Sequence, residues 1–275
     1  GKLDIQNIQS KDAISFILGA DTTDTKGYWA NGKDEYGQTY AEVISNGELT
    51  TGADVSDFTW SYMDLPEEES SYAYTIETLT GMLTEDTVLN AFTEYIVDGP
   101  LVVPDNTTLT IGQGAILRFK NSDDTANVAY LLVAQGGRIE ADGTANYPII
   151  MTHETDDLSV PTTIAESDTG QWGGVMILGY APISVENVAA GGTAALTELD
   201  AALTYGHYGG DVDNDDSGYL RHVSIRYAGA AAGGSTMLNG LTLAGVGNAT
   251  ELSDIDVFAT QDDAVAILGG TVDMT

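Results

Sequence analysis

Four carboxylates occupy six positions in the stretch GGDVDNDDSGYL, residues 209–220: Asp211, Asp213, Asp215 and Asp216. Like charges this close repel one another unless a cation or protons intervene. The alternating spacing of the first three lets their side chains converge on one centre. Ca²⁺ takes about six to eight oxygen ligands in flexible geometry. The loop therefore predicts a calcium site, with a solvated acidic turn as the alternative.

The loop departs from the EF-hand pattern. Asp211, Asp213 and Asp215 match its first three ligand positions. Asp216, however, stands where an EF-hand needs glycine, and His222 stands where it needs the bidentate glutamate. We interpret the stretch as a short acidic calcium loop of the kind found in extracellular repeat proteins.

Other acidic pairs fall at turns, where the simpler interpretation is that they cap main-chain N–H groups. They are Asp123 with Asp124, Asp156 with Asp157, and Asp262 with Asp263. Asp262 and Asp263 separate two similar strands, so we also consider them a weaker second candidate for an ion site.

Two further side chains could do chemistry but have simpler roles. His207 precedes the acidic loop, yet no second histidine has a spacing useful for a metal, so we expect a surface or packing residue. Trp172 opens an apolar run before two glycines. We expect it to pack in the core at a corner rather than to stack on a sugar.

Composition and charge exclude several classes of partner. The chain has 275 residues, 42 of them acidic and 9 basic, for a formal charge of −33, and it has no cysteine. Nucleic-acid binding depends on Lys and Arg neutralising phosphate, so neither nucleic acid nor an anionic membrane is an expected partner. No apolar run reaches the length of a membrane span, so we expect no membrane insertion. Disulfides and thiolate metal sites are excluded.

Short apolar runs separated by Gly, Asn and Asp turns must position these residues. They begin near residue 86 and are typical of β-strands. In the run from 220 to 227, Val223, Ile225 and Tyr227 should point one way, and Ser224 and Arg226 the other. Residues 1–85 show no such pattern, and we expect a capping or assembly segment there.

An internal repeat indicates how the strands stack. Residues 174–179 match 240–245 and 264–269, and the last two copies begin 24 residues apart. A second pattern, Leu-x-x-(Val/Ile)-x-(Ile/Val), begins at Leu220 and again at Leu252. Periods in the twenties without helical spacing favour a β-solenoid, in which inward Val, Ile and Leu form a continuous core and glycines allow the corners.

These motifs, in this order, resemble a family of exported bacterial right-handed parallel β-helix proteins, many of them surface proteins or lipoproteins. The resemblance covers about residues 86–275, from TEYIVDGPLVV through LNGLTLAG to AVAILGGTV. It implies an all-β, right-handed parallel β-helix and export, but no agreed activity. In the family the helix runs on beyond GGTV, so we expect either a fragment ending at Thr275 or a helix completed by something else.

The fold analogy also raises an enzyme alternative, because many right-handed β-helices cleave acidic polysaccharides. Such a lyase needs a base and cations that neutralise the substrate carboxylate, and Arg221 or Arg226 could serve. Only five basic residues lie in 86–275, and a polyanion would meet a negative surface: Arg118, Lys120, Arg138, Arg221 and Arg226. Hydrolases on this fold use paired carboxylates, and the acidic pairs here are too many to single one out.

The sequence therefore predicts a non-catalytic, calcium-binding structural protein, secreted or on the surface of a bacterium. Its role would be that of a surface-layer, filament or adhesive component. Copies would associate through divalent cations. The alternatives are a polysaccharide-binding module, which an exposed aromatic ladder would favour, and a polysaccharide lyase or hydrolase.

Overall fold

The chain winds into a parallel β-helix. The computed structural model describes residues 76–120, 127–159, 163–197, 199, 203–232 and 237–275, which form strands and turns without an α-helix. Fourteen strands join one continuous sheet whose pairings are all parallel. Residues 1–75, most of the predicted N-terminal segment, lie outside the described residues. The fold class predicted from the sequence is confirmed.

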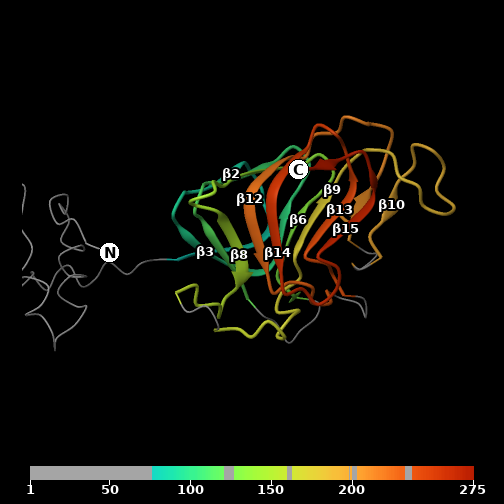
Figure 1. Cartoon of the computed structure of the whole chain (residues 1–275). Coiled ribbons are helices and arrows are strands. Elements are labelled where there is room, and N and C mark those ends of the chain that lie inside the picture. The colour runs from blue at the N-terminus through green and yellow to red at the C-terminus, as the bar shows by residue number, and fades with distance from the viewer. Residues whose placement is uncertain (1–75, 121–126, 160–162, 198, 200–202, 233–236) are drawn as a thin grey trace, which may run out of the picture. The chain divides into compact units, whose positions relative to one another are not determined.

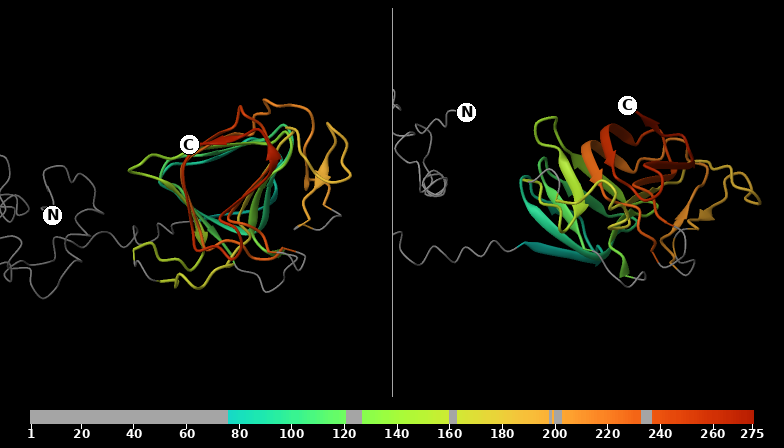
Figure 2. Two further views of the ribbon diagram at one scale, coloured as in Figure 1. Left: turned by 45° about the vertical axis from the view of Figure 1, so that its right-hand side comes forward. Right: turned by 60° about the horizontal axis from the view of Figure 1, so that its bottom comes forward.

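The helix has three faces, and its cross-section is roughly triangular (Figure 2). Face A is formed by β2 (Thr87–Leu89), β4 (Thr108–Ile111), β7 (Arg138–Asp142), the first halves of β12 (Gly218–Arg226) and β14 (Glu251–Phe258), and β16 (Asp273–Met274). Face B is formed by the first halves of β1 (Glu77–Met82) and β3 (Glu94–Val103), then β5 (Ile116–Phe119), β8 (Ile149–His153) and the second halves of β12 and β14.

Face C is formed by the ends of β1 and β3, then β6 (Tyr130–Val133), β9 (Val175–Leu178), β13 (Leu241–Val246) and β15 (Val265–Gly270). The last four lie side by side in Figure 1. One turn of the chain through the three faces is called a rung below. The first strand begins at Glu77, ahead of the residue 86 at which the sequence pattern becomes visible.

Both sequence repeats stack in the register in which they align. Leu241 of β13 pairs with Val175 of β9 on one side and with Val265 of β15 on the other. Leu220 of β12 pairs with Leu252 of β14. Residues at equivalent positions therefore form columns along the helix axis, and their apolar side chains fill the interior, where most are fully buried.

Tyr227 differs from the expectation. Val223 and Ile225 point into the core as predicted, but Tyr227 has a φ of 60° and leaves the strand geometry. Its ring packs edge-on against Phe258 with centroids 5.6 Å apart, and its hydroxyl donates to the main-chain oxygen of Ile164 at 3.2 Å. The alternation fails here because a corner begins where the strand ends.

Glycine is not required at every corner. Between faces A and B, four rungs place Phe92, Gly114, His222 and Asp254 at φ values of 57°, 68°, 48° and 53°, whereas the rung between Gly114 and His222 turns through residues 143–148 instead. The left-handed conformation costs a residue with a Cβ about 1–2 kcal/mol. The stacked rungs impose the same turn on each residue in the column, so packing overrides the local preference.

A second apolar cluster covers the outside of face C. The long connection between β9 and β12, residues 179–217, carries the antiparallel hairpin of β10 (Ala194–Ala195) and β11 (His207–Tyr208). Leu196, Leu199 and Tyr208 from this connection pack against outward side chains of face C such as Leu132 and Met176. No apolar cluster of this kind covers face A or face B among the described residues.

The final rung leaves its interior partly open. Ile267 of β15 is 57% exposed, although Ile177 and Leu243 in the same column are fully buried. No helix of the described chain is long and apolar enough to cross a membrane.

Candidate functional site

The acidic loop lies at the corner between faces C and A, at the end of the long connection. The main-chain oxygen of Asp213 accepts hydrogen bonds from Asn248 N at 3.0 Å and from Thr271 Oγ1 at 2.5 Å. Asn248 and Thr271 belong to two successive later corners. The loop therefore fastens the long connection to the rungs that follow it.

Two of the four carboxylates form hydrogen bonds or ion pairs with other groups of the chain. Asp216 Oδ2 lies 2.6 Å from Arg138 Nη1, and its Oδ1 accepts from Gly218 N at 2.9 Å. Asp215 accepts from Ser217 Oγ at 3.3 Å and from the main-chain N–H of Tyr180. Burial raises the pKa of Asp215 above its ordinary value, and the neighbouring charge of Asp216 acts in the same direction.

Asp211 and Asp213 are exposed, and neither carboxylate has a hydrogen-bond or ion-pair partner within the described residues. Across the same residues, no three His, Asp or Glu side chains are grouped to hold a metal ion. The structure thus brings the four aspartates into one turn without converging their side chains. Calcium binding here stays a prediction.

The other acidic pairs occupy turns. Asp157 Oδ1 accepts from Ser159 N at 3.0 Å and from Ser159 Oγ at 2.6 Å, which confirms the expected capping and lowers the pKa of Asp157. Asp156 instead accepts from Thr152 Oγ1 at 2.7 Å. Asp262 and Asp263 are exposed in the turn between β14 and β15, and the Asp263 main-chain oxygen accepts from Gly240 N at 2.9 Å. Asp123 and Asp124 lie outside the described residues.

Trp172 and His207 have the roles expected of them. Trp172 is fully buried and stacks on Phe119, with ring centroids 3.8 Å apart and an angle of 12° between the planes. Its Nε1–H donates to the main-chain oxygen of Arg226 at 2.7 Å, so the indole is core packing. His207 is exposed at the start of β11, with Nδ1 3.3 Å from the main-chain oxygen of Thr204.

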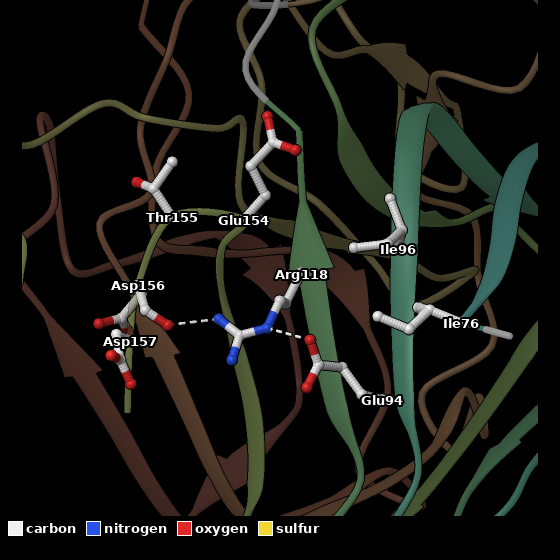
Figure 3. Close-up of a pocket in the computed structure, with 8 residues that line it drawn as sticks. All are labelled: Ile76, Glu94, Ile96, Arg118, Glu154, Thr155, Asp156 and Asp157. Carbon is white, nitrogen blue, oxygen red and sulfur yellow. Dashed lines mark hydrogen bonds and ion pairs between the residues drawn. The ribbon is translucent and has the colours of Figure 1, made fainter. Parts of the chain in front are cut away.

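Sequence reasoning missed a groove on face B with a volume of about 360 Å³ (Figure 3). Arg118 crosses it, paired with the Glu94 carboxylate and donating to the main-chain oxygen of Asp156. Ile76 and Ile96 line the side toward β3, and residues 154–157, all acidic except Thr155, form the opposite side. The groove joins β3 to the turn after β8, which are about sixty positions apart in the chain, so no local motif could reveal it.

Apolar side chains continue from the groove toward the corner between faces A and B. Ile116 and Ile150 occupy paired outward positions on β5 and β8, and both are partly exposed. Phe92 and Tyr147 follow at the corner, 57% and 51% exposed, with ring centroids 5.0 Å apart and perpendicular planes. Outward isoleucines in alternating strands were the available sequence signal, because an exposed sheet face is normally polar.

One buried histidine beside the groove lacks a full set of partners. His153, at the end of β8, has Nδ1 2.8 Å from Thr155 Oγ1, whereas its Nε2 is buried without a hydrogen-bond partner. Burial lowers the pKa of His153 below its ordinary value. Burial of this ring therefore favours its neutral form over the charged one.

The chain matches the family model described as a pectate-lyase-like beta helix domain over residues 81–275, well over half of its length. No curated protein and no solved structure matched it. The match agrees with the stacked parallel strands and three faces seen here, and it carries no information about a surface or lipoprotein family. The chain belongs to the family of pectate-lyase-like β-helix domains.

Proposed function

We propose that this chain is a non-catalytic structural β-helix of a bacterial cell surface or extracellular matrix. The observation that carries the proposal is the pairing of its basic side chains with carboxylates of other rungs. Arg118 pairs with Glu94, Lys120 with Asp98 at 2.8 Å, and Arg138 with Asp216.

Arg221 shows the arrangement most fully. Its guanidinium reaches Asp142 at 3.2 Å on the preceding rung and Glu251 at 2.5 Å on the following one. It also lies over the ring of Tyr219, 4.3 Å from the centroid. Ion pairs of this kind run along the helix axis and add to the main-chain ladders, which suits a stiff element.

The same pairing weighs against a lyase that acts on acidic polysaccharides. Such an enzyme needs cationic groups free to neutralise the substrate carboxylate. Among the Lys and Arg side chains of the described residues, only that of Arg226 has no carboxylate oxygen within 4 Å. Its Nε donates instead to Ser224 Oγ at 2.9 Å. A uronate chain would meet one available guanidinium on a chain with a formal charge of −33.

A cleavage assay tests the catalytic part of the proposal. Incubation with pectate, alginate and sulfated glycans should give no unsaturated products that absorb in the ultraviolet. Turnover that disappears in Arg226→Ala, while Lys120→Ala retains it, would replace the structural role with a lyase activity.

Ordered self-association tests the structural part. The formal charge makes copies of the chain repel one another. Monovalent salt can only screen this repulsion, with a screening length of about 8 Å at physiological ionic strength. Ca²⁺ can in addition bridge carboxylates of adjacent molecules. We expect sheets or filaments with Ca²⁺ and dispersed particles with chelator, measured by light scattering and negative-stain imaging. A monodisperse monomer at millimolar Ca²⁺ would remove the support for a lattice.

Surface location is a separate part of the proposal. Antibodies against the β-helix should label intact cells of the source organism. Labelling only after the cells are permeabilised would contradict the assignment.

A further inference from the structure

Rung stacking accounts for the backbone of this corner but not for its two exposed aromatic side chains. Phe92 occupies the left-handed position of the corner between faces A and B, where a bulky side chain is unusual and glycine is unstrained. Its ring is 57% exposed, so burial does not offset the strain. His222 and Asp254 share this backbone conformation, so what distinguishes Phe92 is a large apolar ring left exposed at the corner.

The two rings are held in place by the rungs beneath them. Gly114 lies one rung on, and a Cβ there would be 2.8 Å from Phe92 Cδ1, so only glycine lets the ring rest on the main chain. Gly114 N also donates to the main-chain oxygen of Tyr147 at 3.0 Å. A tight turn in which Tyr147 N donates to Thr144 O at 3.0 Å fixes the second ring.

The corner continues into the apolar part of face B. Ile116 follows Gly114 on the next strand, and Ile150 lies beside Ile116 in register. Beyond them come Ile96 and the groove crossed by Arg118. This apolar surface therefore ends at a row of acidic residues. Glu94 and Asp157 are already bonded to Arg118 and Ser159, and each carboxylate keeps further capacity to accept hydrogen bonds.

We propose that this surface, comprising Phe92, Tyr147, Ile116, Ile150 and the adjoining groove, binds a neutral polysaccharide. Pyranose rings present C–H faces that pack on aromatic and aliphatic side chains, while their hydroxyls donate to carboxylates. The charge of the chain selects the ligand class: residues Glu94, Glu154, Asp156 and Asp157 line the groove, and Arg118 is already paired. A polyanion is repelled there, whereas an uncharged glycan is not.

Affinity electrophoresis of the full chain tests the inference, because a protein of this charge migrates rapidly and its retardation is easily measured. The native gels contain hydroxyethylcellulose, galactomannan or polygalacturonate. We expect retardation by at least one of the two neutral glycans and none by polygalacturonate. Absence of retardation by both neutral glycans, or stronger retardation by polygalacturonate, overturns the inference.

Two variants separate binding from folding. Phe92→Gly removes the ring and suits the left-handed backbone, so its melting temperature should be equal to or above that of the parent. Phe92→Gly and Tyr147→Ala should each weaken retardation by up to about tenfold, the effect of losing one aromatic contact. Val88→Ala, which truncates an apolar side chain on face A that is at least as exposed as the two rings, is the matched control and should leave retardation unchanged.

Retardation that survives both aromatic substitutions contradicts the inference. Variants that change sedimentation but not glycan retention would show that the corner joins copies of the chain. That result also contradicts the inference. The inference goes beyond the structural role and fails independently of it: a chain that binds no glycan can still form filaments.

Discussion

Arg138 and Asp216 form an ion pair between two rungs, with Nη1 2.6 Å from Oδ2. Arg138 Nη1 also lies 3.1 Å from the main-chain oxygen of Asp216, so one guanidinium holds the end of the acidic loop in two ways. The pair connects β7 to the turn that opens β12, across the longest connection of the described helix. It accounts for part of the concentrated negative charge at residues 211–216 without a metal ion.

Removing this pair should destabilise the protein modestly. Both side chains are partly exposed, so we expect Arg138→Gln to lower the free energy of unfolding by about 0.5–1 kcal/mol. The loss should shrink at high salt, because exposed ion pairs are screened. Urea denaturation at low and high NaCl measures both effects. Lys120→Gln, which removes a similarly exposed pair that lacks the additional hydrogen bond from Arg138 to a main-chain oxygen, is the control and should cost less.

Calcium binding at the acidic loop makes a thermal prediction. A ligand that binds only the folded state at a hundred times its dissociation constant adds about 2.7 kcal/mol. The melting temperature should therefore rise with Ca²⁺ and fall with chelator. Combined substitution Asp213→Ala and Asp215→Ala should abolish that response. If the double variant responds to Ca²⁺ as the parent does, the ion binds elsewhere, and Asp262→Ala with Asp263→Ala becomes the next variant to measure.

The burial of Asp215 makes stability depend on pH. Its pKa is raised in the folded state, so folding favours the protonated form. Its contribution to the free energy of unfolding therefore decreases as pH rises from the unfolded pKa of about 3.9 through the folded value. Asp215→Asn keeps an oxygen that can accept from Tyr180 N and Ser217 Oγ. We expect the variant to be more stable than the parent at pH 7 and equal to it near pH 3.

Calorimetry of both proteins across this range measures the difference. A stability difference that is the same at both ends would show that hydrogen-bond geometry, and not charge, is responsible. Asp211→Asn, at an exposed position of the same loop, is the control for the loss of one negative charge from the loop.

The effect of burial on stability can be compared at one position of face C in two neighbouring rungs. Leu243 and Ile267 are register partners, one fully buried and the other 57% exposed. Leu243→Ala should cost about 2–5 kcal/mol of unfolding free energy, as for a fully buried leucine. Ile267→Ala should cost less than half of that, because its side chain is mostly exposed. Equal losses would mean that the last rung is covered in solution, and sedimentation would then show whether a second copy covers it.

The strands and their stacking could be predicted from the sequence. Alternation along a strand fixes which side chains face inward, and repeated Val, Ile and Leu at matched positions leave one register that buries them all. Leu241 therefore pairs with Val175 and Val265, and Leu220 pairs with Leu252, as the alignment of the repeats predicts. The prediction failed at Tyr227, where a corner interrupts the alternation, and at corners such as Phe92, where packing imposes a conformation that glycine would adopt more easily.

The sequence by itself determined the fold class, the inward side chains and the scarcity of basic groups. Only the tertiary structure decided which charges meet. The connections between rungs differ greatly in length, from a few residues to the whole of 179–217, so positions far apart in the chain become neighbours without any fixed spacing. Arg138 meets Asp216, Arg118 meets Glu94, and Phe92 meets Tyr147 for this reason. Outward side chains contribute little to the register, so the pattern that specifies the helix leaves its surface chemistry free.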